Sequence, residues 1–305
     1  MKQKYFEKIV LTVACFSLVA CSDLARHNFG QDAATVDADT IDLTDQPSAL
    51  KDAGSDQPGQ LLPSDLKGLS VWLDPQRGLT GSTDGISLWA DQSGKANHAY
   101  QTIPGSKPTV HKKGLNGHDT LMFTFENNTY LTIDDADSMH WGTDDYLVAE
   151  VVQYINLPVG GDNDTVVALW VKQRLDVSAA GVALFGNSIA DKPSTSKILT
   201  AVHQLGDPLA YVETTNKGYN DGRFHLVLVH RHGSTLELRV DGVANAVTTG
   251  PVTDVSAPQR NVFIGGGPYR EYMQGEVAEV VAVHGKVSAM EVDQLEQYFR
   301  TKFGL

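Results

Sequence analysis

Short runs that alternate apolar and polar residues dominate the chain after residue 60. Between residues 235 and 240 the alternation is complete, with Leu236, Leu238 and Val240 on one face and polar residues on the other. Because successive side chains of a strand point to opposite faces, this pattern predicts a strand with one buried face. Similar runs, bounded by Gly, Asp, Asn or Pro, predict further strands at LSVWLD, ISLWAD, TLMFTF, YLVAEVVQY, TVVALWVK, FHLVLVHRH, NVFIGG and EVAEVVAVHG.

Two turn signals connect the strands predicted between residues 223 and 248. Gly233 and Ser234 separate the first strand from the second, and Asp241 and Gly242 separate the second from the third. An Asp-Gly pair accommodates the positive φ angles of a tight hairpin. The segment is therefore predicted to be an antiparallel three-stranded meander.

One helix is predicted, at the end of the chain. Ser288 and Glu291 have the spacing of a capping box, and Gly304 suits the C-terminal cap. A single apolar stripe, spaced by three to four residues, consists of Val292, Leu295, Phe299 and Phe303. Many short strands with one terminal helix predict an all-β domain of two packed sheets.

The first 21 residues have the anatomy of an export signal. Basic residues precede an apolar run from Ile9 to Ala20, which is shorter than the roughly 20 residues that cross a bilayer. The run ends in Leu-Val-Ala-Cys, which resembles the lipobox of bacterial lipoproteins. The resemblance implies cleavage before Cys21 and acylation of that residue, and Ser22 after it implies the outer membrane. The alternative is an ordinary secretory signal with an incidental cysteine.

Composition divides the chain into three parts. Residues 1–20 are predicted to be the signal peptide, residues 21–60 a disordered acidic tether, and residues 61–305 one domain, because the segment before residue 60 has too few apolar residues to offset its ordering entropy. Cys15, the other cysteine, lies in the signal, so the mature chain has no disulfide. A formal net charge of −13 without clustered Lys or Arg excludes nucleic acid as a partner.

Four blocks of the domain resemble the laminin-G-like members of the concanavalin A-like jelly rolls. They are LSVWLDPQRGL with ISLWADQSGKANHA, LNGHDTLMFTFENNTYLTI, FHLVLVHRHGSTLELRVDGV, and the last 45 residues from NVFIGGG onward. They occur in the family's order from Leu66 to Leu305, and imply a two-sheet antiparallel jelly-roll sandwich. One departure is that Phe125 to Tyr130 lack the Gly and the second acid that relatives often have there.

The sequence lacks the residue pairs that catalysis needs. Glycosidases require two carboxyl groups that face each other, but Glu276 and Glu279 would point to opposite faces of a regular strand, and Glu150 shares its face with Val152 and Tyr154. Nucleophile elbows and zinc-protease motifs are missing too. The protein is therefore predicted not to be an enzyme, with a glycan-active hydrolase or lyase as the alternative.

Two oxygen-rich loops are candidate calcium sites, since calcium prefers carboxylate and carbonyl oxygens. The candidates are Asp134, Asp135 and Asp137 in one loop and Asp162 and Asp164 in the other. Ordinary turns, which also favour Asp, are the alternative. His230 and His232 share a strand face and could bind zinc or copper, but the sequence identifies no third ligand, and solvated histidines are the alternative.

Three aromatic residues in Gly-, Asp- or Asn-rich segments are candidate ligand contacts: Trp141, Tyr219 and Tyr269. Partial burial of these rings under their loops is the alternative. Loops on rigid β-scaffolds often carry function, and aromatic rings contribute contact area at low entropic cost. We therefore expect an outer-membrane lipoprotein that displays a non-catalytic adhesion domain, with a membrane anchor and a glycan or surface protein as partners. A structural envelope component without a soluble ligand is the further alternative.

Overall fold

The computed structural model describes residues 60–155, 165–172, 181–188, 197–204, 207–249, 252–267 and 271–305. Gly59–Leu305 forms one compact unit. Several sequence predictions lie outside the described residues: the signal peptide, Cys21, the tether before residue 60, Asp162, Asp164 and Tyr269. In these described ranges, no helix combines the length and the apolarity that crossing a membrane requires.

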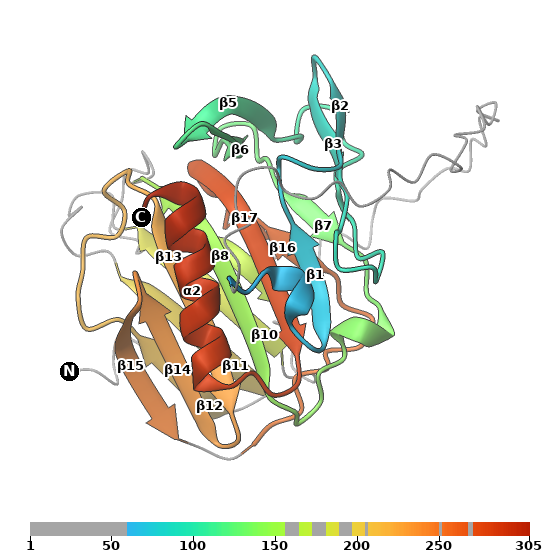
Figure 1. The fold of residues 1–305 in the computed structure, drawn as a ribbon. Coiled ribbons are helices and arrows are strands. Elements are labelled where there is room, and N and C mark those ends of the chain that lie inside the picture. The colour runs from blue at the N-terminus through green and yellow to red at the C-terminus, as the bar shows by residue number, and fades with distance from the viewer. Residues whose placement is uncertain are drawn as a thin grey trace. The chain divides into compact units, whose positions relative to one another are not determined.

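Two antiparallel sheets pack against each other (Figure 1). Sheet A has the order β15-β14-β13-β8-β17-β6-β5, and β1 also pairs with β17. Its strands are β1 (Leu69–Leu73), β5 (Thr109–Leu115), β6 (His118–Phe123), β8 (Tyr146–Tyr154), β13 (His225–His232), β14 (Thr235–Val240), β15 (Val243–Thr249) and β17 (Gly275–His284).

Sheet B has the order β12-β11-β10-β9-β16-β7-β4-β3-β2. Its strands are β2 (Leu79–Ser82), β3 (Gly85–Trp89), β4 (Ala99–Tyr100), β7 (Leu131–Ile133), β9 (Thr165–Lys172), β10 (Gly181–Ser188), β11 (Ile198–Gln204), β12 (Asp207–Glu213) and β16 (Val262–Ile264). Two short 3-10 turns also occur: η2 (Pro63–Asp65) precedes β1, and η3 (Asp137–Met139) lies between β7 and β8. The two-sheet antiparallel sandwich predicted from the sequence is confirmed.

The alternating runs form strands as predicted, and the meander is confirmed as β13, β14 and β15. Asp241 and Gly242 have φ angles of 55° and 77°, which are the positive values that the Asp-Gly turn predicted. The alternation of apolar and polar residues did not predict β4 and β7, because these strands are too short to show it. β5 lies at the edge of sheet A, where exposed Lys112 and Lys113 hide any apolar pattern.

The core lies between the sheets and contains large aromatic side chains. Trp89 and Trp170 are 0 % exposed, and Trp72 on the outer face of sheet A is 5 % exposed, so all three are buried as the sequence indicated. The side chain of Asp91 fixes the turn after β3, since it accepts hydrogen bonds from the backbone N–H of Ser93 at 2.9 Å and of Trp72 at 2.8 Å. The turn is therefore tied to β1.

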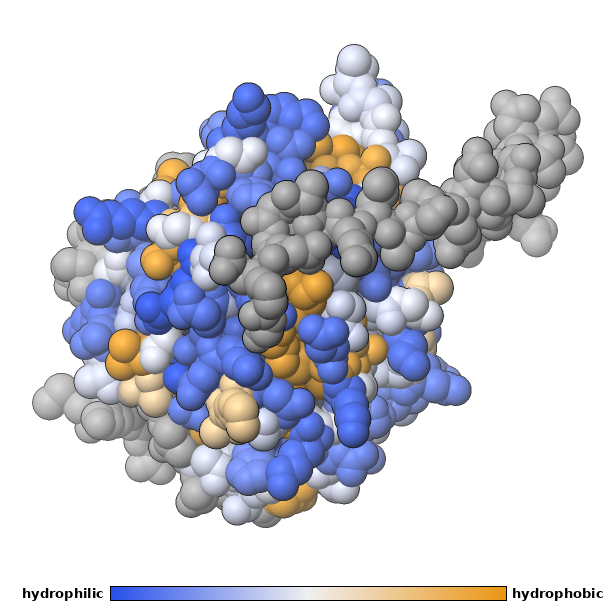
Figure 2. Space-filling view, viewed as in Figure 1, coloured by the Kyte–Doolittle hydropathy of each residue, from blue (hydrophilic) through white to orange (hydrophobic). Residues whose placement is uncertain are grey.

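The helix α2 (Ala289–Phe303) covers the outer face of sheet A (Figure 1). Its capping box is confirmed: Ser288 Oγ accepts from the Glu291 N–H at 3.2 Å, and Glu291 Oε2 accepts from the Ser288 N–H at 2.8 Å. Gly304 has a φ angle of 70° at the C-cap. The surface seen from this side is mainly hydrophilic (Figure 2), because the apolar stripe of α2 is turned toward the sheet.

Candidate functional site

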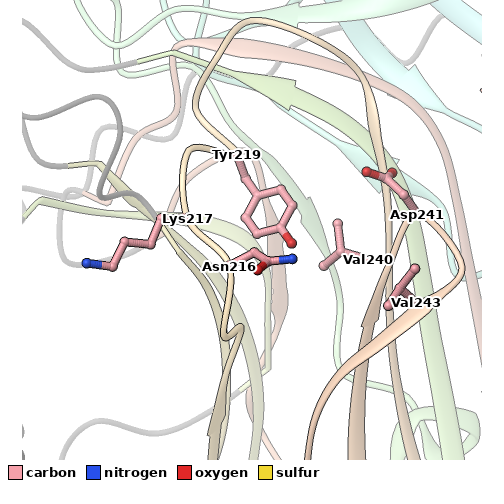
Figure 3. A pocket seen from close by; sticks show the side chains of 6 residues that line it. All are labelled: Asn216, Lys217, Tyr219, Val240, Asp241 and Val243. Carbon is pink, nitrogen blue, oxygen red and sulfur yellow. The ribbon is translucent and has the colours of Figure 1, made fainter.

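A pocket of about 470 Å³ opens where the β14–β15 hairpin meets the segment between β12 and β13 (Figure 3). It is lined by Asn216, Lys217, Tyr219, Val240, Asp241 and Val243. One wall is therefore a tight hairpin of sheet A, and the other is the loop that precedes β13. Tyr219 is one of the three aromatic residues that the sequence predicted as ligand contacts.

The hairpin wall is held in place by the helix. Gly242 has a φ angle of 77°, which disfavours other residues, and a Cβ there would displace the guanidinium group of Arg300 on α2. Arg300 also donates a hydrogen bond from Nη2 to the carbonyl oxygen of Asp241. Docking of α2 therefore fixes the backbone that presents Asp241 to the pocket.

His225 connects the two walls. Its Nδ1 lies 2.9 Å from Oδ2 of Asp241 in the hairpin, and its Nε2 lies 3.2 Å from Oδ1 of Asp221 in the loop. Ionised carboxylates only accept hydrogen bonds, so this geometry favours the protonated imidazole, in which both ring nitrogens donate. Burial lowers the pKa of His225, but the hydrogen bonds and charges of Asp241 and Asp221 outweigh it, and the pKa is raised.

Tyr219 forms the back of the pocket rather than an exposed platform. The residue is 9 % exposed, and its ring meets the ring of His225 edge-on at 5.2 Å between centroids. Asn216 and Lys217 on the same loop are exposed. The lining thus combines an amide, a lysine and a carboxylate with one aromatic ring, although the Lys217 side chain points away from the ring (Figure 3) and Asp241 also accepts a hydrogen bond from the Leu226 N–H. Such a mixed lining suits a polar ligand that also has apolar surface.

Trp141, a candidate ligand contact in the sequence, is buried in the core. It is 1 % exposed and stacks on Tyr146 at 5.1 Å and on Trp170 at 6.5 Å between ring centroids. The 3-10 turn η3 directly before it turns the loop inward, so the indole enters the core between the sheets. Because Trp141 is in the core and Tyr269 is outside the described residues, the structure does not assemble the three predicted aromatics into one site.

Two carboxylates of the acidic loop at residues 134–137 contact other side chains of the protein. Asp135 accepts a hydrogen bond from Lys172 Nζ at 2.6 Å and lies 2.9 Å from His140 Nε2. Asp134 accepts from the Tyr100 hydroxyl at 2.6 Å, while Asp137 is exposed. Over the residues that the structure describes, no three His, Cys, Asp or Glu side chains are placed to share a metal ion. The geometry therefore does not support a calcium site built from Asp134, Asp135 and Asp137.

The two histidines of β13 are not a zinc site by the same criterion. The rings of His230 and His232 stack at 6.0 Å between centroids, and His232 Nδ1 lies 3.2 Å from Oδ2 of Asp145. Burial is the largest of the effects that lower the pKa of His230, followed by the nearby His232. The side chain of His230 is therefore neutral and packs on the outer face of sheet A.

The relation between Glu276 and Glu279 differs from the sequence prediction. A bulge between Val277 and Glu279 shifts the alternation of β17, so both carboxyl groups lie on the outer face of sheet A instead of on opposite faces. Glu279 is 0 % exposed and pairs with Lys302 Nζ at 2.8 Å beneath α2. Glu276 pairs with His111 at 3.0 Å. Since Glu279 is sealed under the helix, the pair does not face a substrate cleft.

Glu150 is a third acid in an unusual setting. It lies on the inner face of β8 with Val152 and Tyr154, as predicted, and it is 0 % exposed. Neither carboxyl oxygen has a hydrogen-bond partner, and burial raises the pKa of Glu150 to about 8. The carboxyl group is therefore protonated at neutral pH and is closed off from any substrate.

The pocket residues illustrate what sequence reasoning missed. The Asp-Gly turn was recognised, but only as a turn, and His225, Asn216 and Lys217 were not singled out. These residues can be recognised only from contacts between segments that are distant in the chain. A local sequence pattern does not reveal such contacts.

Residues 196–295 match the laminin G domain family. Characterised protein sequences give no match to this chain. Among solved structures, the binding domain of Paraclostridial Mosquitocidal Protein 1 has a TM-score of 0.56 at 11 % identity, covering 78 % of this chain and 53 % of that chain.

Two further similar structures are the binding domain of Botulinum Neurotoxin DC in complex with SialylT and with rat synaptotagmin II. The first has a TM-score of 0.51 at 7 % identity, covering 76 % of this chain and 52 % of that chain. The second has a TM-score of 0.50 at 8 % identity, covering 76 % and 51 %. This chain thus spans about half of the length of these binding domains. The match to the laminin G domain family is therefore confined to residues 196–295, and the fold is a two-sheet antiparallel jelly-roll sandwich like that of these binding domains.

Proposed function

We propose that the protein is a non-catalytic adhesion module, held at the outer membrane by a lipid anchor, and that it binds a glycan through the pocket between Asn216 and Val243. The observation that carries this proposal is the pocket itself, whose lining includes one aromatic ring, an amide, a lysine and a carboxylate. Sugars combine an apolar ring face with many hydroxyl groups, and such a mixed lining matches both.

Rigid walls favour binding in this pocket. His225 joins the two walls through Asp241 and Asp221, and Arg300 fixes the hairpin from behind. A preformed site avoids the entropic cost of ordering its loops when the ligand arrives. This makes the pocket a better candidate than an exposed loop aromatic.

The similar structures agree with a binding role. Each is named as a binding domain, and complexes with SialylT and with rat synaptotagmin II exist for one of them. Those ligands belong to domains about twice the length of this chain, so they suggest only the classes of ligand, a glycan or a protein. A non-catalytic role also agrees with the carboxyl groups of Glu150 and Glu279, both of which are fully buried.

The binding proposal is tested on a glycan array, followed by titration of the best glycan. Lys217→Ala and Asn216→Ala are expected to weaken binding by about tenfold each, since each removes a polar contact worth about 1.4 kcal/mol. Lys95→Ala, which removes an exposed lysine elsewhere, is the matched control. Equal affinity in all variants would move the ligand away from the pocket. Cleavage of the glycan would instead support the hydrolase alternative.

The anchor is tested separately from binding. The LVAC sequence that ends at Cys21 supports acylation, and the acidic segment that follows supports a flexible spacer to the domain. Cys21→Ala is expected to abolish acyl labelling and release the protein from membranes, whereas Cys15→Ala is expected to change neither. Unchanged labelling of Cys21→Ala would refute the anchor.

A further inference from the structure

A row of side chains on sheet B faces away from the core. Leu88 pairs with Tyr100, Tyr100 with Thr132, and Thr132 with Phe263, so these four residues share one face of neighbouring strands. The adjacent row has the opposite orientation and faces the core, with exposures of 0–1 %: Trp89, Ala99, Ile133 and Val262. The first row therefore lies on the outer face of sheet B.

Two of the four residues in this outer row are aromatic, and all four are partly exposed, whereas the next residues of the row, Val171 and Ala183, are 5 % and 0 % exposed. Tyr130 lies two residues before Thr132 and so shares its face, and its ring centroid is 6.1 Å from that of Phe263. The ring of Tyr272 lies 6.1 Å from Tyr130 on the other side. Among the described residues, α2 is the one α-helix, and it packs on sheet A rather than on sheet B. We call Tyr100, Tyr130, Thr132 and Phe263 the tyrosine face.

A polar margin borders the tyrosine face. Asp134 lies two residues after Thr132 and accepts hydrogen bonds from the Tyr100 hydroxyl at 2.6 Å and from Asn261 Nδ2 at 3.2 Å. The bond to Asp134 is the main reason that the pKa of Tyr100 is raised to about 12. The phenol is therefore a neutral group of fixed orientation, and Asp134 is exposed with room to accept further hydrogen bonds.

We propose that the tyrosine face binds an uncharged polysaccharide. Aromatic rings stack on the apolar C–H faces of sugars, while Asp134, Asn261 and Thr132 offer hydrogen bonds to hydroxyl groups. The tyrosine face crosses β4, β7 and β16, which span roughly 10 Å across the sheet at about 4.8 Å per strand, and it is an open surface rather than a pocket. A chain of sugars fits this shape better than a single small ligand.

Charge selects the kind of polysaccharide. The positions of the tyrosine face and its margin include no Lys or Arg, and their one charged residue is Asp134. A sulfated or sialylated chain would therefore meet repulsion without compensation. A single carboxyl group also lacks the partner that glycoside cleavage requires, so the face is expected to bind without hydrolysis.

This inference rests on the proposed binding function only in treating the domain as a glycan-binding module, because the surface is separate from the pocket. The pocket is built by the β14–β15 hairpin of sheet A and the loop at residues 216–219, and none of these residues belongs to the tyrosine face. Variants of one surface therefore serve as controls for the other.

Affinity electrophoresis of the full protein tests the inference, with dextran, laminarin and xyloglucan as uncharged probes and heparin as the anionic probe. Retardation is expected in at least one uncharged gel and not in heparin. Tyr130→Ala and Phe263→Ala are each expected to weaken that retardation by about tenfold. Tyr130→Phe keeps the ring and is expected to be retarded as strongly as wild type. Thr132→Arg, which covers the face without removing a ring, is the second blocking variant should an alanine variant unfold.

The possible results separate the two surfaces. No retardation in any uncharged gel, or equal retardation of wild type, Phe263→Ala and Thr132→Arg, would overturn the tyrosine face as a site. Loss of retardation in Lys217→Ala but not in Phe263→Ala would assign the polysaccharide to the pocket and also overturn it. Retardation that needs Phe263 but not Lys217 would support the tyrosine face even if the pocket proposal fails on the array.

Discussion

The outer faces of the two sheets differ in what covers them. On sheet A, α2 buries Leu295 and Phe299 against Leu147 and Val281, and all four side chains are 0 % exposed. On the outer face of sheet B, Tyr100 and Phe263 stay partly exposed, although Val171 and Ala183 in the same row are buried. The first face is apolar because a helix removes it from water, and the second combines rings with hydroxyl and carboxyl groups that tolerate water.

The two outer faces are therefore expected to have different roles, the face under α2 in stability and the outer face of sheet B in binding. A helix-covered face contributes buried apolar area to folding, so its residues are constrained by packing. An open face contributes less to folding and is available for contact with a ligand. Substitutions on the two faces are therefore expected to have different costs.

The largest expected effect is on the covered face. Phe299→Ala removes a fully buried ring and is expected to lower the free energy of unfolding by about 3–5 kcal/mol. Phe263→Ala on the open face is expected to cost about 1 kcal/mol or less, since its ring is partly in water already. Urea unfolding of both variants measures the difference. Equal costs would show that the two faces are equally important for folding.

A comparable loss is expected from the charges under α2. Lys302 Nζ lies 2.9 Å from Asp74 and 2.8 Å from Glu279, and all three groups are buried. Lys302→Ala removes the ammonium group between two buried carboxyl groups and is expected to cost about 3–5 kcal/mol. Asp134→Ala, which removes a charge from the open face, is expected to cost about 1 kcal/mol or less. An unchanged unfolding midpoint for Lys302→Ala would refute the buried network.

The inner face adds a pH-dependent term of a few kcal/mol. Folding raises the pKa of Glu150 to about 8, so the folded state binds one more proton than the unfolded state between the ordinary pKa of Glu and pH 8. Stability from this group is fully present at acid pH and falls as pH rises toward 8, by up to about 1.4 kcal/mol per pH unit.

Unfolding of Glu150→Gln, compared with wild type at several pH values, checks this. The stability of the variant relative to wild type is expected to increase from pH 5 to pH 8, because Gln has no proton to lose. Parallel pH curves for the two proteins would mean that Glu150 is ionised in the fold.

The smallest effect concerns the pocket, which belongs to neither outer face. The protonated form of His225 is favoured in the fold, so its contribution is fully present below its ordinary pKa and is lost as pH rises through the raised value. His225→Gln is expected to cost about 1–2 kcal/mol at pH 6 and less at pH 9. A cost that does not change with pH would indicate that His225 is neutral and joins only one wall.

The sequence predicts the elements better than the contacts between them. Alternation in β14, the Asp-Gly turn and the Ser288 capping box are local signals, because each depends on residues within a few positions, and each is confirmed. The order of strands in sheet B has no such signal. Strands as short as β4 pair because their neighbours position them.

The site was harder to predict for the same reason. Trp141 has loop-like neighbours in sequence, but the turn before it directs the indole into the core. The bulge beside Glu279 reverses a face assignment that holds for a regular strand. His225 becomes significant only when Asp221 and Asp241 meet it in space, and Asp241 is 16 residues away along the chain.

The central claim is that this domain binds glycans without cleaving them, through surfaces that α2 does not cover. Chemical-shift mapping by NMR, with the best glycan from the array, tests it most directly. Shifts are expected at residues 216–225 and 240–243 or on the tyrosine face, with the amides of α2 unmoved at its exposed turns and the glycan intact afterwards. Shifts concentrated on the exposed side of α2, or release of shorter sugars during the titration, would contradict the claim.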